Sequence, residues 1–261
     1  MKQELLNLGC GSFIHEDWTN VDFVSTNENV IPYNLLLGIP FNSNTFDAVY
    51  HSHVLEHFKK SSALFFIKEC YRVLKPGGCL RVVVPDFESL CGEYLKLLKL
   101  ALDGSDEAKL NYDWIVVEIL DQISRDEPGG EMAKVLMQDY LPNLDYIESR
   151  IGIDVREKIL AGKQGKNCKS KKRNILFRLL KSIFGKHIDY YRIGKFRSSG
   201  DTHKWMYDRY SLSRLLLESG FKEIQIKNAY ESNISNFSQY NFDVYKGNKR
   251  GVSSLFIEAL K

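Results

Sequence analysis

The chain has 261 residues, of which 44% are hydrophobic and 26% are charged, a composition typical of a soluble globular protein. This length is enough to bury a full core in one large domain, or in one domain with a sizeable insertion. The formal net charge of +3 is too small to predict nucleic-acid binding by itself, so we expect no nucleic-acid partner.

The five cysteines argue against a disulfide framework and against a structural zinc site. They are odd in number and form no C-x-x-C pair, which fits a reducing compartment, and we expect a cytoplasmic protein. Residues 1–3 lead directly into the first predicted strand, and no apolar run reaches membrane-spanning length. We therefore expect neither a signal peptide nor a transmembrane helix.

From Glu4 to Pro85, short leucine-rich or β-branched runs alternate with amphipathic segments. This is the pattern of a parallel sheet with covering helices. Apolar residues at helical spacing predict a helix from Ser62 to Leu74, which the following Pro-Gly-Gly ends. The predicted strands lie near residues 4–8, 18–22, 29–32, 46–50 and 79–84.

The first predicted strand ends in a glycine turn, Gly9-Cys10-Gly11, and the second ends in Asp22. Glycines at the carboxyl end of a buried strand let the backbone approach a ligand closely, and a carboxylate ending the next strand can accept both hydroxyls of a ribose. The pattern predicts a nucleotide-type cofactor site, with a plain tight turn as the alternative. A nicotinamide cofactor is disfavoured, because position 14 is Ile14 instead of glycine and the acidic residue comes too soon.

The connection between these two strands is unusually short. Barely a dozen residues run from Gly9 to Asn20, which is close to the minimum for a parallel crossover, so we expect its helix to be reduced to about one turn.

Residues 87–200 are predicted to be mostly helical. Helix-period stretches occur at 90–102, 112–123, 132–139 and 146–160, and Leu95, Leu98 and Leu102 share one face of the first. We expect an insertion that forms a substrate-binding lid over the carboxyl ends of the strands, where ligands of open α/β sheets bind. The predicted division is therefore a core of residues 1–86 and 201–261 and a helical lid of residues 87–200.

A lysine-rich stretch, residues 163–173, precedes a basic amphipathic segment at 175–184. One interpretation is a solvated loop followed by a helix whose apolar face joins the core. Others are contact of residues 169–184 with an anionic membrane surface, or binding of an acidic or phosphorylated substrate. Beyond the insertion, the sequence predicts a helix at 211–219 and strands at 223–229 and 252–260.

Five motifs resemble, in order, the landmarks of the class I S-adenosylmethionine-dependent methyltransferases, and most closely the type 11-like members of polysaccharide and natural-product pathways. They are the glycine turn with Asp22, Phe46-Asp47-Ala48-Val49-Tyr50, Val54-Leu55-Glu56-His57-Phe58, Tyr71-Arg72-Val73-Leu74-Lys75-Pro76-Gly77-Gly78 and Ser219-Gly220-Phe221. The resemblance covers residues 4–86 and 203–261. It implies an α/β, Rossmann-like fold whose seven-stranded sheet has the order 3-2-1-4-5-7-6, with the last strand antiparallel.

The resemblance also implies a cofactor and the residues that bind it. The cofactor would be S-adenosylmethionine, with S-adenosylhomocysteine as product. We expect no metal, because His51, His53 and His57 match neither H-E-x-x-H nor a comparable ligand spacing. Asp22 would bind the ribose hydroxyls, or serve only as a surface residue capping its strand. Asn34 would bind the adenine amino group, or serve only as a turn residue. The full predicted set is Asn7, Gly9, Cys10, Gly11, Asp22, Phe23, Asn34, Leu35 and His51.

A histidine followed by an aromatic residue resembles a segment of related sugar and polysaccharide methyltransferases, and here it is His203 in Asp201-Thr202-His203-Lys204-Trp205. Imidazole titrates near neutral pH, so His203 is a candidate general base, with His53 and Asp86 as alternatives. It could equally hold the lid by hydrogen bonds.

We expect in-line methyl transfer to an oxygen of a small-molecule or saccharide-like acceptor, with specificity set by the insertion and by the tyrosine-rich residues 230–245. N-methylation of a peptide or small natural product, action on a protein or nucleic acid, and a non-catalytic S-adenosylmethionine-binding module remain alternatives. The sequence leaves open whether the protein is a monomer or a homodimer.

Overall fold

The computed structural model describes residues 3–25, 27–152, 175–245, 248–249 and 253–261. These residues form two compact units. The core unit consists of the chain up to Ser89 and from Lys204 onward, and the helical unit consists of Leu90–His203. None of the helices in the described ranges combines the length and hydropathy needed to cross a membrane.

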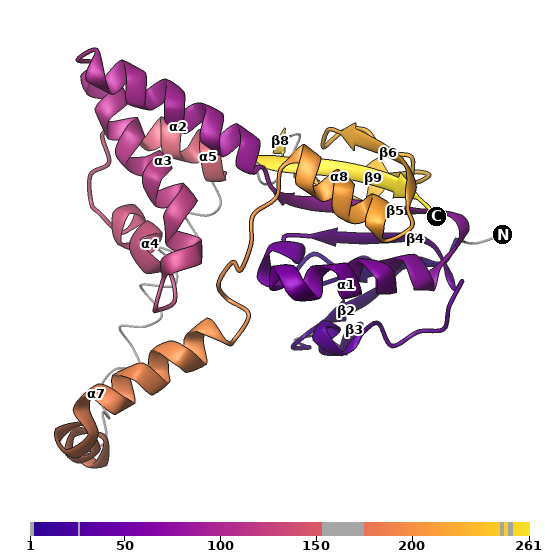
Figure 1. The fold of residues 1–261 in the computed structure, drawn as a ribbon, viewed down its shortest axis with the longest axis horizontal. Helices are drawn as coiled ribbons and strands as arrows, with labels where there is room; N and C mark the ends of the chain where they lie inside the picture. The colour runs from indigo at the N-terminus through magenta and orange to yellow at the C-terminus, as the bar shows by residue number, and fades with distance from the viewer. Residues whose placement is uncertain (1–2, 26, 153–174, 246–247, 250–252) are drawn as a thin grey trace. The chain divides into compact units, whose positions relative to one another are not determined.

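The core unit is built on a seven-stranded sheet in the order β3-β2-β1-β4-β5-β9-β6 (Figure 1). Strands β1 to β5 pair in parallel, and β9 runs antiparallel to both β5 and β6. Because β6 and β9 are the sixth and seventh strands of this sheet along the chain, the predicted order 3-2-1-4-5-7-6 is confirmed. The strands are β1 Leu5–Leu8, β2 Trp18–Asp22, β3 Val30–Pro32, β4 Phe46–Ser52, β5 Leu74–Pro85, β6 Lys222–Lys227 and β9 Ser254–Leu260.

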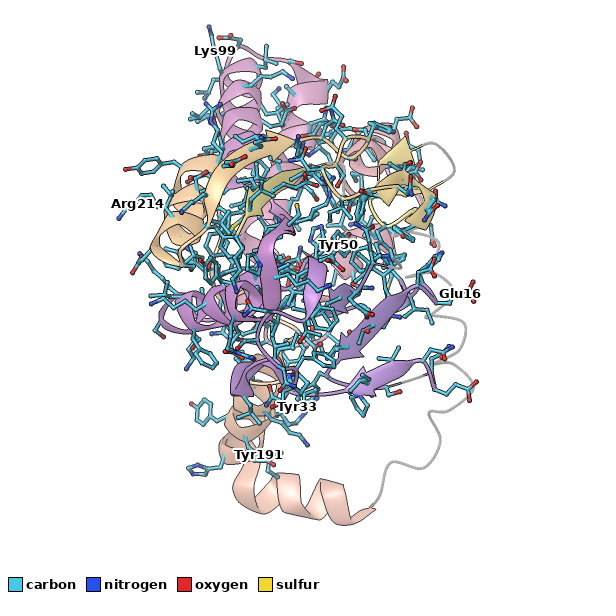
Figure 2. All side chains as sticks on the ribbon, turned by 90° about the vertical axis from the view of Figure 1, so that its right-hand side faces the viewer. Glu16, Tyr33, Tyr50, Lys99, Tyr191 and Arg214 are labelled. Carbon is cyan, nitrogen blue, oxygen red and sulfur yellow. The ribbon has the colours of Figure 1, made fainter. Side chains whose placement is uncertain are left out.

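One face of the sheet is covered by the irregular segment 228–245, which includes the 3-10 turn η3, Phe237–Tyr240. Phe242 of this segment stacks on Tyr50 at 5.0 Å between ring centroids and meets Trp18 edge-on at 5.2 Å. Figure 2 shows Tyr50 in the interior of the core unit, with Arg214 and Glu16 at its surface. The tyrosine-rich segment was predicted to set specificity, but its buried aromatic rings form core.

A buried ion network fastens this segment to the sheet. Arg81 of β5 is fully buried and donates from Nε to Asp243 Oδ2 at 2.7 Å and from Nη1 to Glu258 Oε1 at 2.8 Å. It also donates to the main-chain oxygens of Asn228 and Glu231, both at 2.8 Å. A buried guanidinium is tolerated only when its donors are matched in this way.

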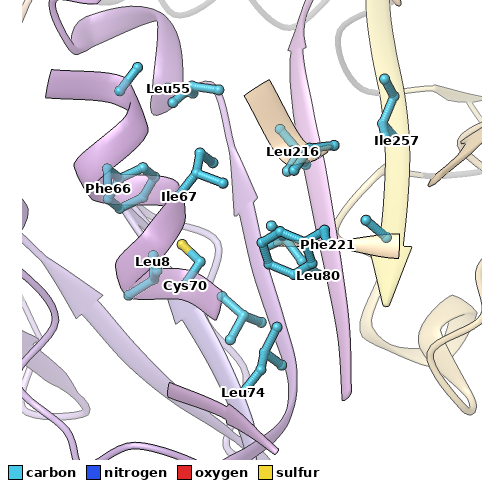
Figure 3. Close-up of a cluster of buried hydrophobic side chains, with 14 of the residues drawn as sticks. Leu8, Leu55, Phe66, Ile67, Cys70, Leu74, Leu80, Leu216, Phe221 and Ile257 are labelled. Atoms are coloured by element: carbon cyan, nitrogen blue, oxygen red, sulfur yellow. The ribbon is translucent and has the colours of Figure 1, made fainter. Parts of the chain in front are cut away.

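Two helices, α1 (Lys60–Val73) and α8 (Arg209–Glu218), pack side by side on the other face. Figure 3 shows Phe66, Ile67 and Cys70 of α1 directed at the strands, where they bury apolar surface against β1 and β5. The Asp208 side chain begins α8 by accepting from the N–H groups of Tyr210 and Ser211 in a capping box.

β5 begins five residues earlier than predicted. Leu74 already pairs with Phe46, and the ladder then slips, so that the next pair is Ala48 with Cys79. The predicted helix stop at residues 76–78 therefore lies within an irregular part of a strand. The segment 228–245 ends in the short strand β7 (Val244–Tyr245), which pairs antiparallel with β8 (Asn248–Lys249).

The helical unit contains α2 Phe87–Leu102, which starts in the core unit, α3 Asp106–Ser124, α4 Gly130–Leu136, α5 Leu144–Ile151 and α7 Ile175–Arg197. Trp114, Leu136, Leu141 and Ile147 form its core. The predicted apolar face of α2 is not its buried face, because Leu95 and Leu102 are 62% and 80% exposed.

The helix predicted at 146–160 ends at Ile151, because Gly152 leaves the helical conformation at φ 89°. Residues 153–160 lie outside the described residues, as do the lysine-rich stretch 163–173 and the side chains of 175–184. Membrane contact through residues 169–184 therefore stays a prediction.

Candidate active site

The predicted cofactor residues follow the carboxyl ends of β1 to β4, which meet at one edge of the sheet because these strands are parallel. Gly9 and Gly11 both have left-handed backbones, at φ 63° and 53°. The N–H groups of Gly9 and Cys10 donate to Val21 O at 2.8 and 3.3 Å, and the N–H of Gly11 donates to Asp22 Oδ2 at 2.7 Å. A hydrogen bond therefore joins the glycine turn to the Asp22 carboxylate.

The two glycines face different surroundings. A Cβ atom at Gly9 would overlap the Val54 side chain, whereas one at Gly11 would meet nothing within 4 Å. Gly9 is thus required by packing, and Gly11 leaves open space beside the carboxylate. An open, left-handed turn of this kind lets a ligand approach the main chain closely.

Two buried asparagines support the turn from beneath. Asn7 Nδ2 donates to Phe13 O at 2.8 Å and to Asn20 Oδ1 at 3.0 Å. Asn20 Nδ2 donates to the main-chain oxygens of His15 and Trp18 at 3.0 and 2.8 Å. These bonds organise the short crossover, which contains two tight turns and no helical turn between β1 and β2: Phe13 N–H donates to Cys10 O at 2.8 Å, and Trp18 N–H donates to His15 O at 3.1 Å.

The role of Asn20 was missed, although a signal was present: a polar amide in a strand bounded by apolar residues has to find partners once buried. The predicted role of Asn7 changes as well. Its Nδ2 is committed to the crossover, so Asn7 acts on the site through the shape of the glycine turn. The Cys10 side chain is buried and packs in the core. Burial and then the Asp22 charge raise the pKa of its thiol to about 11.

The residues predicted to bind the ribose and the adenine lie at the end of β2 and just after β3. The Asp22 side chain is half-buried, and the next residue, Phe23, is 65% exposed. Asn34 Oδ1 accepts from Leu36 N–H at 3.0 Å and so caps the 3-10 turn η1 (Leu35–Leu37), in which Leu35 is buried. Asn34 therefore serves as a turn residue, and its binding of the adenine amino group stays a prediction.

His51 was predicted to touch the cofactor, but the structure places its ring in the core. Residues on β4 alternate between faces, so Tyr50 lies under the segment 228–245 and His51 lies under α1, 5.2 Å from Phe66. The His51 ring is fully buried, and within the described part of the chain neither nitrogen has a hydrogen-bond partner. Burial lowers its pKa to about 4, so His51 is neutral at physiological pH.

His53 lies just beyond β4 with a left-handed backbone, φ 55°. Its Nδ1 is 3.1 Å from Oε1 of Glu56, a fully buried residue of the 3-10 turn η2 (Leu55–His57), and its Nε2 is 3.1 Å from Ser254 Oγ. Partial desolvation of the ring, whose side chain is still 43% exposed, disfavours the charged form, but the neighbouring Glu56 carboxylate outweighs it and raises the His53 pKa. The sequence pointed to His53 and did not assign roles to Glu56 or Ser254.

The other two candidate bases are placed differently. Asp86 caps α2 by accepting from the N–H groups of Glu88 and Ser89 at 3.1 and 3.3 Å, and burial raises its pKa. His203 belongs to the helical unit, where its N–H donates to Gln122 O at 2.9 Å. Asp86 is thus occupied at a helix start, and the role of His203 as base stays a prediction.

Residues 24–82 match the sequence family described as a methyltransferase domain, and no curated protein sequence matches the chain. Among solved structures, an S-adenosylmethionine-dependent methyltransferase from Archaeoglobus fulgidus is 13% identical, with 99% of this chain and 86% of that chain covered and a TM-score of 0.40. A possible histamine N-methyltransferase from Thermotoga maritima is 11% identical, with 100% and 83% covered and a TM-score of 0.39.

The cyclase SpnF is 23% identical over 31% of this chain, with a TM-score of 0.27, and the match spans 38% of the SpnF length. With TM-scores this low, the solved structures carry no argument about this chain. Its likeness to methyltransferases rests on the family match of residues 24–82 and on the strand order of the sheet.

Proposed function

We propose that this chain, which carries a methyltransferase domain of the class I fold, is an enzyme that methylates a small-molecule or saccharide-like acceptor with S-adenosylmethionine. The observation that supports this best is the open turn at Gly11 held against the Asp22 carboxylate at 2.7 Å. The turn offers main-chain groups at close range, and the carboxylate can accept two ribose hydroxyls.

The remaining cofactor residues have distinct tasks. Gly9 keeps the turn close to the start of η2, because no side chain fits between its main chain and Val54. Phe23 presents an exposed aromatic ring next to Asp22 and is suited to cover a planar base. Asn34 and Leu35 provide an amide and apolar contact for the adenine.

Oxygen is the atom we propose to be methylated. S-adenosylmethionine supplies an activated methyl group, so the protein's task is to orient the acceptor, exclude water and accept a proton. A hydroxyl loses its proton on methylation, and an imidazole can take it near neutral pH. His53 at the carboxyl edge and His203 in the helical unit are the proposed proton acceptors, and the saccharide-like class is supported by the resemblance of Val54–Phe58 and His203–Tyr207.

Calorimetric titration with S-adenosylmethionine tests the cofactor site. We expect the wild type to bind and Asp22→Ala to bind at least tenfold more weakly, a loss of about 1.4 kcal/mol, because both the ribose acceptor and the anchor of Gly11 N–H disappear. Glu218→Ala removes an equal charge at the exposed end of α8 and should bind like the wild type.

Two outcomes would contradict the proposal. Absence of binding by the wild type would remove the cofactor assignment, and equal affinity of Asp22→Ala would move the site elsewhere. Binding without transfer to any hydroxyl acceptor in a panel of phenols and saccharides would instead favour a non-catalytic module.

A further inference from the structure

Three side chains from different parts of the core unit meet beyond the carboxyl end of β4. Ser254 begins β9, His53 follows β4, and Glu56 lies in η2. The Ser254 Oγ to His53 Nε2 distance and the His53 Nδ1 to Glu56 Oε1 distance are both 3.1 Å. Each ring nitrogen of His53 therefore has one side-chain oxygen at 3.1 Å.

The backbone at His53 indicates that this contact is specified by the fold. A positive φ is uncommon for a residue with a side chain, and His53 adopts 55° immediately after a regular strand. In this conformation, the His53 N–H donates to Val83 O at 2.9 Å, so β5 also fixes its position. The ring consequently lies between Ser254, which begins β9, and Glu56 of η2.

The chemistry of the partners determines where the ring carries its proton. A carboxylate only accepts hydrogen bonds, so Glu56 selects the form of neutral His53 with the proton on Nδ1. Nε2 then carries a lone pair, and the Ser254 hydroxyl donates to it. The half-buried Ser254 keeps its own oxygen lone pairs available to a further donor.

We propose that Ser254, His53 and Glu56 form a proton relay, in which Ser254 receives the proton of an acceptor hydroxyl while passing its own proton to His53 Nε2. This inference rests on the proposed function. As the acceptor oxygen bonds to the methyl carbon, its O–H bond breaks, a new O–H bond forms on Ser254, and the old Ser254 proton forms the Nε2–H bond. Ser254 ends unchanged, and the His53 ring gains one positive charge beside the Glu56 carboxylate.

Charged groups around the ring favour this product. Partial desolvation of the ring opposes its charge, and Glu56 of η2 and Asp243 of the segment 228–245 both stabilise the protonated form. Tyr207, which precedes α8, is also near Glu56: burial and then the Glu56 charge raise the pKa of its phenol, so Tyr207 stays neutral and adds no competing charge. Glu56 is thus a positioning residue that acts through His53.

The test is a pH titration of the histidine rings in the full chain by long-range ¹H–¹⁵N correlation spectra, with the His53 signals assigned from His53→Gln. We expect the neutral ring to carry its proton on Nδ1 and to titrate above the ordinary value of 6.5. Glu56→Gln should lower this midpoint by about one pH unit, a tenfold change. Ser254→Ala should shift the Nε2 resonance and leave the proton on Nδ1, and Glu218→Gln should change neither.

A neutral ring with its proton on Nε2 would overturn the relay, and this observation needs no variant that has to fold. An unchanged midpoint in a folded Glu56→Gln would overturn the role of Glu56. Calorimetry with S-adenosylmethionine separates this failure from that of the proposed function: we expect the Glu56→Gln and Ser254→Ala proteins to keep wild-type cofactor affinity within about twofold.

Discussion

Gly9 and Gly11 share a left-handed backbone and differ in what a side chain would meet there. We expect Gly11→Ala to lower the free energy of unfolding by about 1–2 kcal/mol, the cost of a left-handed L-residue. Gly9→Ala should cost about 1–3 kcal/mol more, because its Cβ also overlaps Val54. Urea unfolding measures both. Val54→Ala in the Gly9→Ala background should recover part of the difference, and equal costs for the two glycines would contradict the packing argument.

His51 makes the stability of the core dependent on pH. Its folded pKa of about 4 lies below the ordinary 6.5, so the unfolded chain binds its proton first. The stabilisation is complete above pH 6.5 and falls away as the pH drops from 6.5 to 4, by about 3 kcal/mol. His51→Leu should flatten the dependence of unfolding free energy on pH over this range. His187→Leu removes an exposed histidine and should not; identical slopes in all three proteins would refute the assignment.

At the scale of an element, the segment 228–245 depends on Arg81. Arg81→Met leaves Asp243 and Glu258 buried without their cation, and we expect a loss of about 3–5 kcal/mol of unfolding free energy. Lys75→Met breaks the pair with Asp47, which is only partly buried, and should cost less than about 1 kcal/mol. Hydrogen exchange should rise first in residues 228–245 of the Arg81 variant. Uniform exchange across the sheet would show that the network does not hold this segment specifically.

The sequence predicted the strands and α1 because their apolar residues repeat with the period of the element itself. It could not predict how the segment 228–245 is used. Phe242 and Phe237 become core only because Tyr50 and Trp18, far away in the chain, present their rings on the same face of the sheet. Likewise, the sequence could not predict roles for Glu56 and Ser254, because these roles depend on the contact of both residues with His53 and no spacing along the chain relates the two.

At the scale of the whole molecule, the chain leaves and re-enters the core unit at neighbouring positions. Asp86 and Tyr207 form a β-bridge, and Phe87 N–H donates to Tyr207 O at 2.9 Å. We therefore expect that replacing residues 90–203 with a flexible Gly/Ser linker of about six residues leaves a folded core, since such a linker spans roughly 13 Å on average. Thermal unfolding and calorimetry with S-adenosylmethionine check this. A cooperative transition with cofactor affinity within about tenfold of the full chain is expected, and an unfolded product would show that the core needs the helical unit.

The pairing of β5 with β9 has a consequence for synthesis of the protein on the ribosome. β9 is translated only after the helical unit and the core residues that follow it, so one edge of β5 stays unpaired while the ribosome adds residues 86–253. At about 5–20 residues per second this interval is on the order of 10–30 s. An unpaired strand edge templates association with other chains, so the nascent chain is most exposed to aggregation, and to chaperone capture, during translation of the insertion.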